Sequence, residues 1–196
     1  MFINGITNDE VACRKTSQEA DVQITVKEVL ELAFTIATKE YASLKDGINL
    51  NLKFATAEDA KSARAWIADK SKDGYGNLPW ERAVHKARFS SKKFVVGIHC
   101  EEELVGLLSG DIDLDKKIVN LRQIERDGSK GNFEGRAIPF ASRLMYTISE
   151  VFELDEIRIL EPAKGLLNRY KEFFNDAEEI KNRPPYLRVP VYKLSS

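Results

Sequence analysis

The run from Gly128 to Ala137 has the residue types of an anion-binding turn. It lies between a segment with the alternation of a strand and an apolar segment with helical periodicity. A glycine-containing turn at the start of a helix leaves backbone N–H groups without partners, and the positive end of the helix dipole lies among them. Turns of this kind bind anions, most often phosphate groups. The pattern alone has low specificity, so the neighbouring elements decide what it means.

The segments around this turn predict a definite order of helices and strands. Three strands follow one another with short connections, which favours an antiparallel meander. Pro79 is well placed as the first residue of a helix, and Pro190 places the last strand at an edge or on a bulge. The predicted helices span residues 22–44, 56–70, 79–88, 136–152 and 163–174, and the predicted strands span 48–54, 94–99, 104–112, 118–125, 156–160 and 186–192.

Two short patterns fall at fixed places in this order. The stretch Asn132-Phe133-Glu134-Gly135-Arg136-Ala137 follows the meander, and Tyr170-Lys171-Glu172-Phe173-Phe174-Asn175 ends the predicted helix over 163–174. The whole order, with both patterns, resembles the GNAT N-acetyltransferase superfamily over roughly residues 48–194. In that family the first pattern reads Arg/Gln-x-x-Gly-x-Gly/Ala and the second Tyr-x-x-x-Gly-Phe. Asn132 departs from the first pattern, and the Gly-Phe pair is replaced in the second.

The resemblance implies an α/β (α+β) fold. We expect a GNAT-like mixed, mostly antiparallel central sheet flanked by helices, with an extra N-terminal helix. Residues 1–47 would form a helical extension packed on the core, and residues 48–196 a GNAT-like acyltransferase domain.

The same resemblance implies an acyl-CoA-dependent N-acyltransferase. Such an enzyme would transfer acetyl from acetyl-CoA, as co-substrate, to an amine by direct transfer in a ternary complex. The acceptor would be a small molecule or a protein that bears an amine. The residues expected to bind the cofactor are Ile124 on the third meander strand and Asn132, Phe133, Glu134, Gly135, Arg136 and Ala137 in the loop.

Direct acetyl transfer needs a group that protonates the departing sulfur and a group that takes the amine proton. Tyr170 is the candidate general acid, and its alternative role is that of a tyrosine in the core or at its rim. Glu125 is the candidate base, directly or through water. Its alternative role is a solvated carboxylate paired with a neighbouring arginine in the charged stretch 122–126.

The composition excludes several classes of protein. The 196 residues carry a formal net charge of −1, which gives no basic field for nucleic acid. Cys13 and Cys100 lack metal-type spacing, so we expect neither a metal site nor a disulfide framework. There is no secretory signal pattern and no apolar run of about 20 residues that would span a bilayer. We therefore expect a cytoplasmic protein, and the N-terminal helix leaves a homodimer face open.

A second function class stays open at this point. Asn132, the Glu134 carboxylate and the lost Gly-Phe pair would also suit a catalytically inactive GNAT-like protein with a binding or regulatory role. Coenzyme A binding would separate the two classes.

Overall fold

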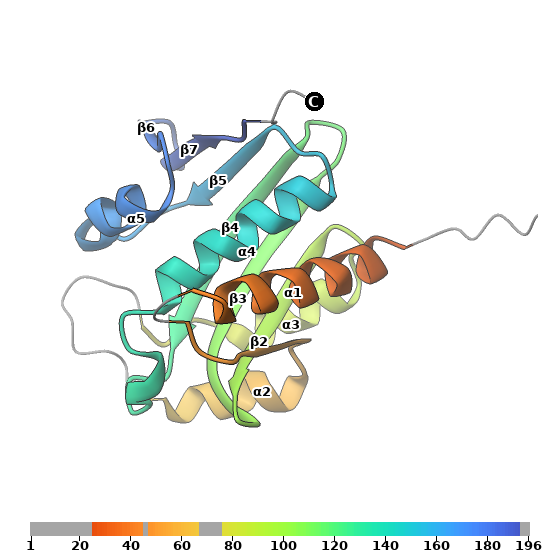
Figure 1. Cartoon of the computed structure of the whole chain (residues 1–196), viewed down its shortest axis with the longest axis vertical. Coiled ribbons are helices and arrows are strands. Elements are labelled where there is room, and N and C mark those ends of the chain that lie inside the picture. The colour runs from red at the N-terminus through yellow and green to blue at the C-terminus, as the bar shows by residue number, and fades with distance from the viewer. Residues whose placement is uncertain (1–24, 45–46, 67–75, 193–196) are drawn as a thin grey trace, which may run out of the picture.

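The computed structural model describes residues 25–44, 47–66 and 76–192 of the chain. Within these ranges, seven strands form one sheet in the order β1-β2-β3-β4-β5-β7-β6 (Figure 1). Neighbouring strands are antiparallel except for β4 and β5, which are parallel. The strands are β1 (Asn51–Phe54), β2 (Lys93–Cys100), β3 (Glu103–Asp113), β4 (Ile118–Arg126), β5 (Glu156–Leu160), β6 (Glu178–Ile180) and β7 (Tyr186–Pro190).

Helices cover both faces of the sheet. On one face α1 (Val26–Ala42) lies beside α4 (Ala137–Val151), and the ring of Tyr41 meets that of Phe140 edge-on at 5.1 Å (Figure 1). The opposite face is covered by α2 (Ala57–Ser62) and α3 (Trp80–Arg88), where Trp80 packs against Val95 and Leu107. Short 3₁₀ turns precede or follow helices; they are η1 (Ala63–Ala65), η2 (Gly131–Phe133) and η3 (Lys164–Leu166). Helix α5 (Leu167–Phe173) lies beside the first half of α4, where the Ser142 hydroxyl donates to the Phe173 carbonyl. None of the described helices is both long and apolar enough to cross a bilayer.

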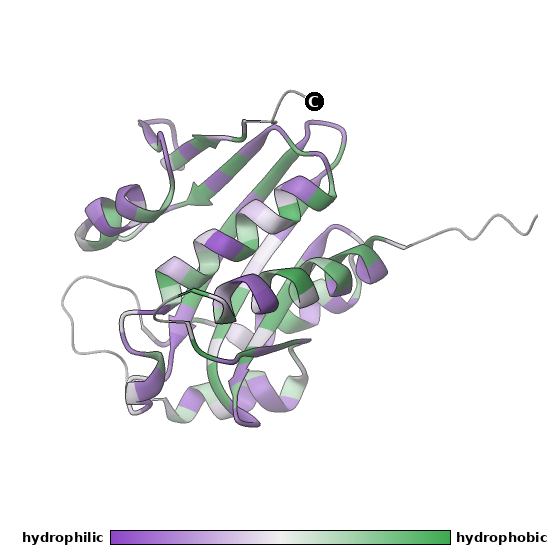
Figure 2. Ribbon diagram, viewed as in Figure 1, coloured by the Kyte–Doolittle hydropathy of each residue, from purple (hydrophilic) through white to green (hydrophobic). Residues whose placement is uncertain are grey.

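The meander β2-β3-β4 forms the centre of the sheet, as the sequence predicts. Strands β2 and β3 carry near-continuous buried residues because helices cover both faces there. In β5 and β7, buried and less buried residues alternate, and Figure 2 shows this as green and purple bands along both strands. The meander and its flanking helices confirm the predicted mixed, mostly antiparallel GNAT-like sheet.

One irregularity in β4 shapes the middle of the molecule. Ser109 of β3 pairs with Gln123, but the next residue, Gly110, pairs with Leu121. Arg122 is therefore an extra residue in β4, a β-bulge that bends the strand. β5 pairs with β4 only from Ile118 to Leu121, so among the described residues the rest of β4 has no strand partner on that side. The two parallel strands separate beyond the bulge.

The N-terminal helix α1 begins with a complete capping box. The Thr25 hydroxyl accepts from the Glu28 backbone N–H, and the Glu28 carboxylate accepts from the Thr25 N–H at 2.7 Å. Its buried residues join the core that contains α4 and the sheet; they are Leu30, Ala33, Phe34, Ala37 and Tyr41. The sequence predicts this helix from residue 22, and residues 22–24 lie outside the described part of the chain, as do residues 67–70 of the next predicted helix.

The C-terminal third departs from the prediction in three places. The predicted helix over 163–174 is a 3₁₀ turn followed by α5, which ends at Phe173. The short strand β6 was not predicted, because three residues give no measurable alternation. Pro190 lies in β7, which is an inner strand, but β6 pairs only as far as Arg188. The prediction that this strand lies at an edge or on a bulge is therefore wrong, and Pro190 is tolerated because β7 has passed the end of its outer neighbour at that residue.

Candidate active site

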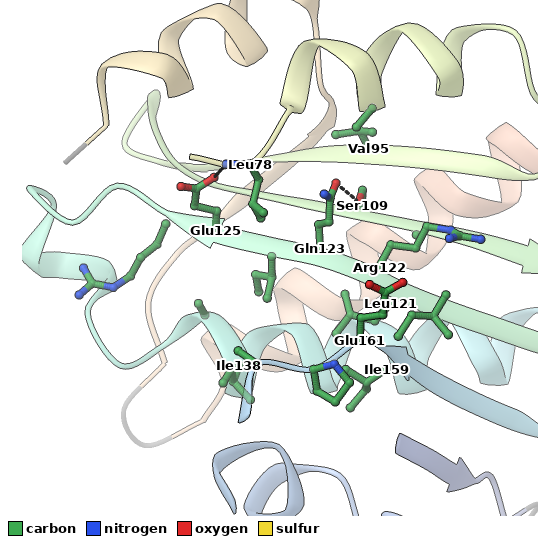
Figure 3. A pocket seen from close by; sticks show the side chains of 18 of the residues that line it. Leu78, Val95, Ser109, Leu121, Arg122, Gln123, Glu125, Ile138, Ile159 and Glu161 are labelled. Carbon is green, nitrogen blue, oxygen red and sulfur yellow. Dashed lines mark hydrogen bonds between the residues drawn. The ribbon is translucent and has the colours of Figure 1, made fainter. Parts of the chain in front are cut away.

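A cavity of about 710 Å³ opens where β4 separates from β5. This volume is within the range of small-molecule sites, roughly 300–1,000 Å³. α4, α5 and the end of β5 line one side, and α3 with β2 and β3 lines the other. Figure 3 shows Ile138 and Ile159 on the first side and Leu78 and Val95 on the second, with β4 between them. Residues from both faces of the sheet therefore line the cavity.

The loop before α4 presents free backbone amides to this cavity. The N–H groups of Phe133, Glu134 and Arg136 donate to carbonyls within the loop. Those of Gly135, Ala137 and Ile138 have no acceptor among the described residues, and all three residues line the cavity. No side chain caps the first turn of α4, and the turn contains no acidic residue. This helix start has the unpaired donors and the positive dipole end that anions bind.

Gly135 has the backbone conformation that the sequence pattern requires. Its φ is +68°, in the left-handed region that glycine adopts without strain. A Cβ added here would meet no atom within 4 Å, so the requirement for glycine is one of backbone conformation. The open space beside the free amides would also admit a bulky anion.

Four other residues of the predicted cofactor loop do not line the large cavity; they are Asn132, Phe133, Glu134 and Arg136. Phe133 is fully buried and packs against Phe140, with ring centroids 6.4 Å apart. Asn132 is exposed and lines no described cavity. The Glu134 side chain is 72% exposed, with its Oε1 atom 3.7 Å from Nη2 of Arg126. The Glu134 carboxylate therefore points toward solvent and a cation.

Consecutive residues of β4 point to the two sides of the sheet. Ile124 packs against the core on the α4 side and lines the cavity. Gln123 and Glu125 point toward α3, as Figure 3 shows, and Gln123 accepts a hydrogen bond from the Ser109 hydroxyl at 3.3 Å. β4 thus contributes residues to both halves of the site.

The carboxylate of Glu125 is held by three N–H donors. Oε1 accepts from the backbone of Asn77 at 2.8 Å, and Oε2 accepts from the backbone of Leu78 at 3.2 Å and from the indole Nε1 of Trp80 at 2.6 Å. Glu125 is only 8% exposed. It is neither the solvated carboxylate nor the arginine-paired one that the sequence left open as its alternative. Its negative charge lies at the start of α3, where it complements the helix dipole.

Tyr170 lies on α5, at the wall of the same cavity. It is 5% exposed, its ring is 6.2 Å from that of Phe174, and no hydrogen bond to its hydroxyl occurs within the described ranges. Burial raises the pKa of Tyr170 to about 12, so the phenol stays protonated at neutral pH. A protonated hydroxyl without a protein acceptor can donate its proton to a ligand.

The structure adds Arg169, which the sequence gave no reason to select. Its Nη2 atom donates to the Gly135 carbonyl at 3.4 Å, and its Nη1 atom donates to Glu172 at 2.7 Å. Arg169 lines both the large cavity and a second one of about 500 Å³, which lies between the end of α1 and the start of α4. Tyr41 of α1 and Leu44, two residues after its end, line this second cavity. The contact between Arg169 and the Gly135 carbonyl joins residues 34 positions apart, so only the folded position of α5 reveals it.

Solved N-acetyltransferase structures have the same fold. No protein-family model matches the sequence, and no curated protein matches it. PaiA N-acetyltransferase from Thermoplasma acidophilum, in complex with coenzyme A, gives a TM-score of 0.53 at 9% identity, over 74% of this chain and 100% of that one. RimJ from Mycobacterium smegmatis, in complex with CoA-disulfide, gives 0.51 at 12% identity, over 74% and 82%. The GNAT domain of PAT from S. lividans gives 0.51 at 15% identity, over 76% and 94%.

At these identities the similarity shows the fold. The chain therefore has the GNAT N-acetyltransferase fold, as its sequence pattern predicts. The described cavity lies at the point where the two parallel strands of that fold separate.

Proposed function

We propose that this chain is an acyl-CoA-dependent N-acyltransferase that transfers acetyl from acetyl-CoA to an amine within a ternary complex. The observation that carries the proposal is the convergence of three features on one cavity. These are the uncapped start of α4, the unpaired side of β4 and the protonated hydroxyl of Tyr170. Two of the similar structures, PaiA and RimJ, were solved with coenzyme A or its disulfide, which supports the proposal.

The residues at the start of α4 fit the pyrophosphate of coenzyme A. The amides of Gly135, Ala137 and Ile138 supply donors, and Gly135 leaves the space in front of them open. Arg169 would add a charge-assisted contact from α5. We assign Asn132, Phe133, Glu134 and Arg136 to this loop as supporting residues, whose positions keep the free amides in place.

β4 and α5 would supply the groups around the reacting thioester. The backbone at Ile124, on the unpaired side of β4, would bind the cofactor arm. The hydroxyl of Tyr170 would donate its proton to the departing sulfur and regain one from water. Proton donation of this kind contributes about 10²–10⁴-fold to a rate. Glu125 would hold the start of α3 in place on the side of the cavity where the acceptor binds, because its carboxylate already accepts from three N–H groups there.

The cofactor site can be tested with a charge reversal that separates binding from folding. An acidic residue in the first turn of a helix stabilises it by about 0.3–1 kcal/mol. Arg136→Glu at the start of α4 places a carboxylate beside the free amides, so coenzyme A binding should weaken at least tenfold in calorimetry, and urea denaturation of the same variant measures any separate change in stability. Lys27→Glu is the matched control, because Lys27 lies in the first turn of α1 and lines neither cavity.

Two results would count against the cofactor site. A wild-type melting temperature that does not rise in millimolar acetyl-CoA would remove the proposal, since saturating ligand stabilises by RT ln(1 + [L]/Kd). Equal coenzyme A affinity of wild type and Arg136→Glu would move the binding site away from α4.

A binding or regulatory protein without catalysis is the second candidate. The observation that favours it is the engaged state of Glu125, which among the described lining residues is the carboxylate on the α3 side of the cavity and accepts from three N–H donors. This candidate predicts coenzyme A binding with no acetyl transfer to any acceptor. The activity assay described below separates the two.

A further inference from the structure

The α3 side of the cavity is lined by cations without counterions. Arg82 and Lys86 lie one turn apart on α3, and Lys93 begins β2 across the opening. Within the described part of the chain, none of the three has an ion pair or a hydrogen-bonded carboxylate. Like charges four residues apart destabilise a helix, so the pair on α3 has a small cost in the free protein. An anion bound in the cavity would offset this cost.

Carboxylates that could bind a cationic molecule are scarce on the same side. Among the described lining residues the acidic ones are Glu125 and Glu161. Glu125 is already held by three N–H donors, and Glu161 lies at the end of β5, across β4 (Figure 3). Arg122 also lines the cavity, and its partner Asp111 does not. The charge on the α3 side is therefore strongly positive, although the whole chain is near neutral.

Between these cations and β4 lies a smaller neutral surface. The Ser109 hydroxyl and the Gln123 amide are hydrogen-bonded to each other, and Ala83, Ala87 and Val95 supply apolar contacts. These residues can bind the body of a small amine, while the cations contact groups at its outer end. Among the described residues of this surface, no side chain is a carboxylate or an imidazole that would take a proton from a charged amine.

We propose that the acceptor is a compound in which the reacting α-amine stands beside one or more carboxylates. This inference rests on the proposed function and names its substrate class. The carboxylates would contact Arg82, Lys86 and Lys93. The α-amine of a peptide suits a site in which Glu125 is already engaged, because its pKa of about 7.7–8.0 leaves roughly half of it neutral at pH 8, whereas a lysine side chain with a pKa of about 10.4 is almost wholly charged.

The transfer step then balances without an added base. The amine nitrogen forms a bond to the acetyl carbon as the carbon–sulfur bond breaks. The nitrogen loses one proton to water, and the sulfur gains one from Tyr170, which recovers a proton from water. The products are the N-acetylated acid and the free thiol.

The test compares acceptors that differ in charge. The purified full chain, acetyl-CoA and each acceptor are mixed at pH 8, and free thiol is measured over time. The acceptors are free glutamate, a glutamate tripeptide, an alanine tripeptide and spermidine. We expect one or both acidic acceptors to exceed the alanine tripeptide at least tenfold in kcat/KM and to exceed spermidine further. Free glutamate and the tripeptide distinguish a small-molecule acceptor from a peptide N-terminus.

Variants on α3 test the charge argument directly. Removal of a charge that lies about 4 Å from an opposite charge on the ligand, in water, changes the dissociation constant by about fivefold. Arg82→Gln with Lys86→Gln should therefore raise the KM for the acidic acceptor by about 25-fold, with the Kd for coenzyme A unchanged. Arg88→Gln is the control, because Arg88 lies on the same helix and does not line the cavity. Lys86→Glu should shift the preference toward spermidine.

Each remaining result is decisive. The inference is overturned if the alanine tripeptide or spermidine reacts as well as the acidic acceptors, or if the double variant lowers all acceptors equally. It is also overturned if coenzyme A binds and no acceptor reacts, which favours the non-catalytic candidate. Failure to bind coenzyme A would instead reject the proposed function itself.

Discussion

The hydroxyl of Tyr170 contributes little to folding, and Tyr170→Phe tests this directly. No hydrogen bond to it occurs within the described residues, and the ring keeps its contact with Phe174 in the variant. A buried hydroxyl without a partner costs about 1–3 kcal/mol on protein scales, and part of that cost is absent here because the residue lines a cavity. We therefore expect the free energy of unfolding at pH 7 to stay the same or rise by about 1 kcal/mol, measured by urea denaturation.

The same variant should alter stability at high pH. Burial raises the pKa of Tyr170 from 10.0 to about 12, so the unfolded chain releases this proton before the folded chain does. Its contribution is fully present below pH 10 and is lost as the pH rises toward 12, a loss of about 3 kcal/mol. The Phe variant has no such proton. The difference in unfolding free energy between wild type and variant should therefore shift by about 3 kcal/mol in favour of the variant across this range.

Tyr170→Phe should lower the activity without lowering the stability at pH 7. Without the proton donor, turnover should fall by about 10²–10⁴-fold, while the Kd for coenzyme A stays within about twofold. Full turnover would remove Tyr170 as the general acid. A loss of more than about 2 kcal/mol at pH 7 would contradict the geometry instead, since it would mean that the hydroxyl has a structural partner.

Three further substitutions test the site. Glu125→Gln places an NH₂ group against an N–H donor, so stability should fall by about 1–3 kcal/mol in urea denaturation; an unchanged midpoint would mean that the carboxylate is not held. Gly135→Ala should cost about 1 kcal/mol because φ is +68°, and Gly135→Asn should cost less, in thermal melts without ligand. Equal melting temperatures of wild type and Gly135→Ala would contradict this. Arg169→Gln should raise the Kd for coenzyme A about fivefold at low ionic strength, and the difference should shrink near 1 M salt; a difference that does not change with salt would exclude a charge contact.

The parts of the fold that the sequence predicted correctly have strong local patterns. The three meander strands are separated by short polar turns, and each strand is found within a residue or so of its predicted ends. The helix after the loop was predicted from residue 136 and begins at Ala137, since its apolar residues recur with helical spacing. In the loop, Gly135 was selected because it matches a glycine of the family pattern, and its φ of +68° is a conformation that glycine adopts without strain.

The parts that the sequence could not give depend on contacts between distant segments. Arg169 is one exposed cation among many until α5 is placed beside the Gly135 carbonyl. The bulge at Arg122 leaves no signal in composition, because it is defined by the register of β3 against β4. The net charge of the chain is near zero and averages over the whole surface. It therefore gave no indication of the positive charge on the α3 side of the cavity.

Glu125 shows most clearly why such contacts matter for function. Its three donors lie 45 to 48 residues earlier in the chain, so no local pattern indicates that its charge is already engaged. The bonds tie the start of α3 to the part of β4 that has separated from β5. Because Ile124 is the adjacent residue, the same few residues of β4 contribute to both halves of the cavity. The hydrogen bonds of Glu125 hold the start of α3 against β4, so the spacing between the two halves of the cavity depends on them.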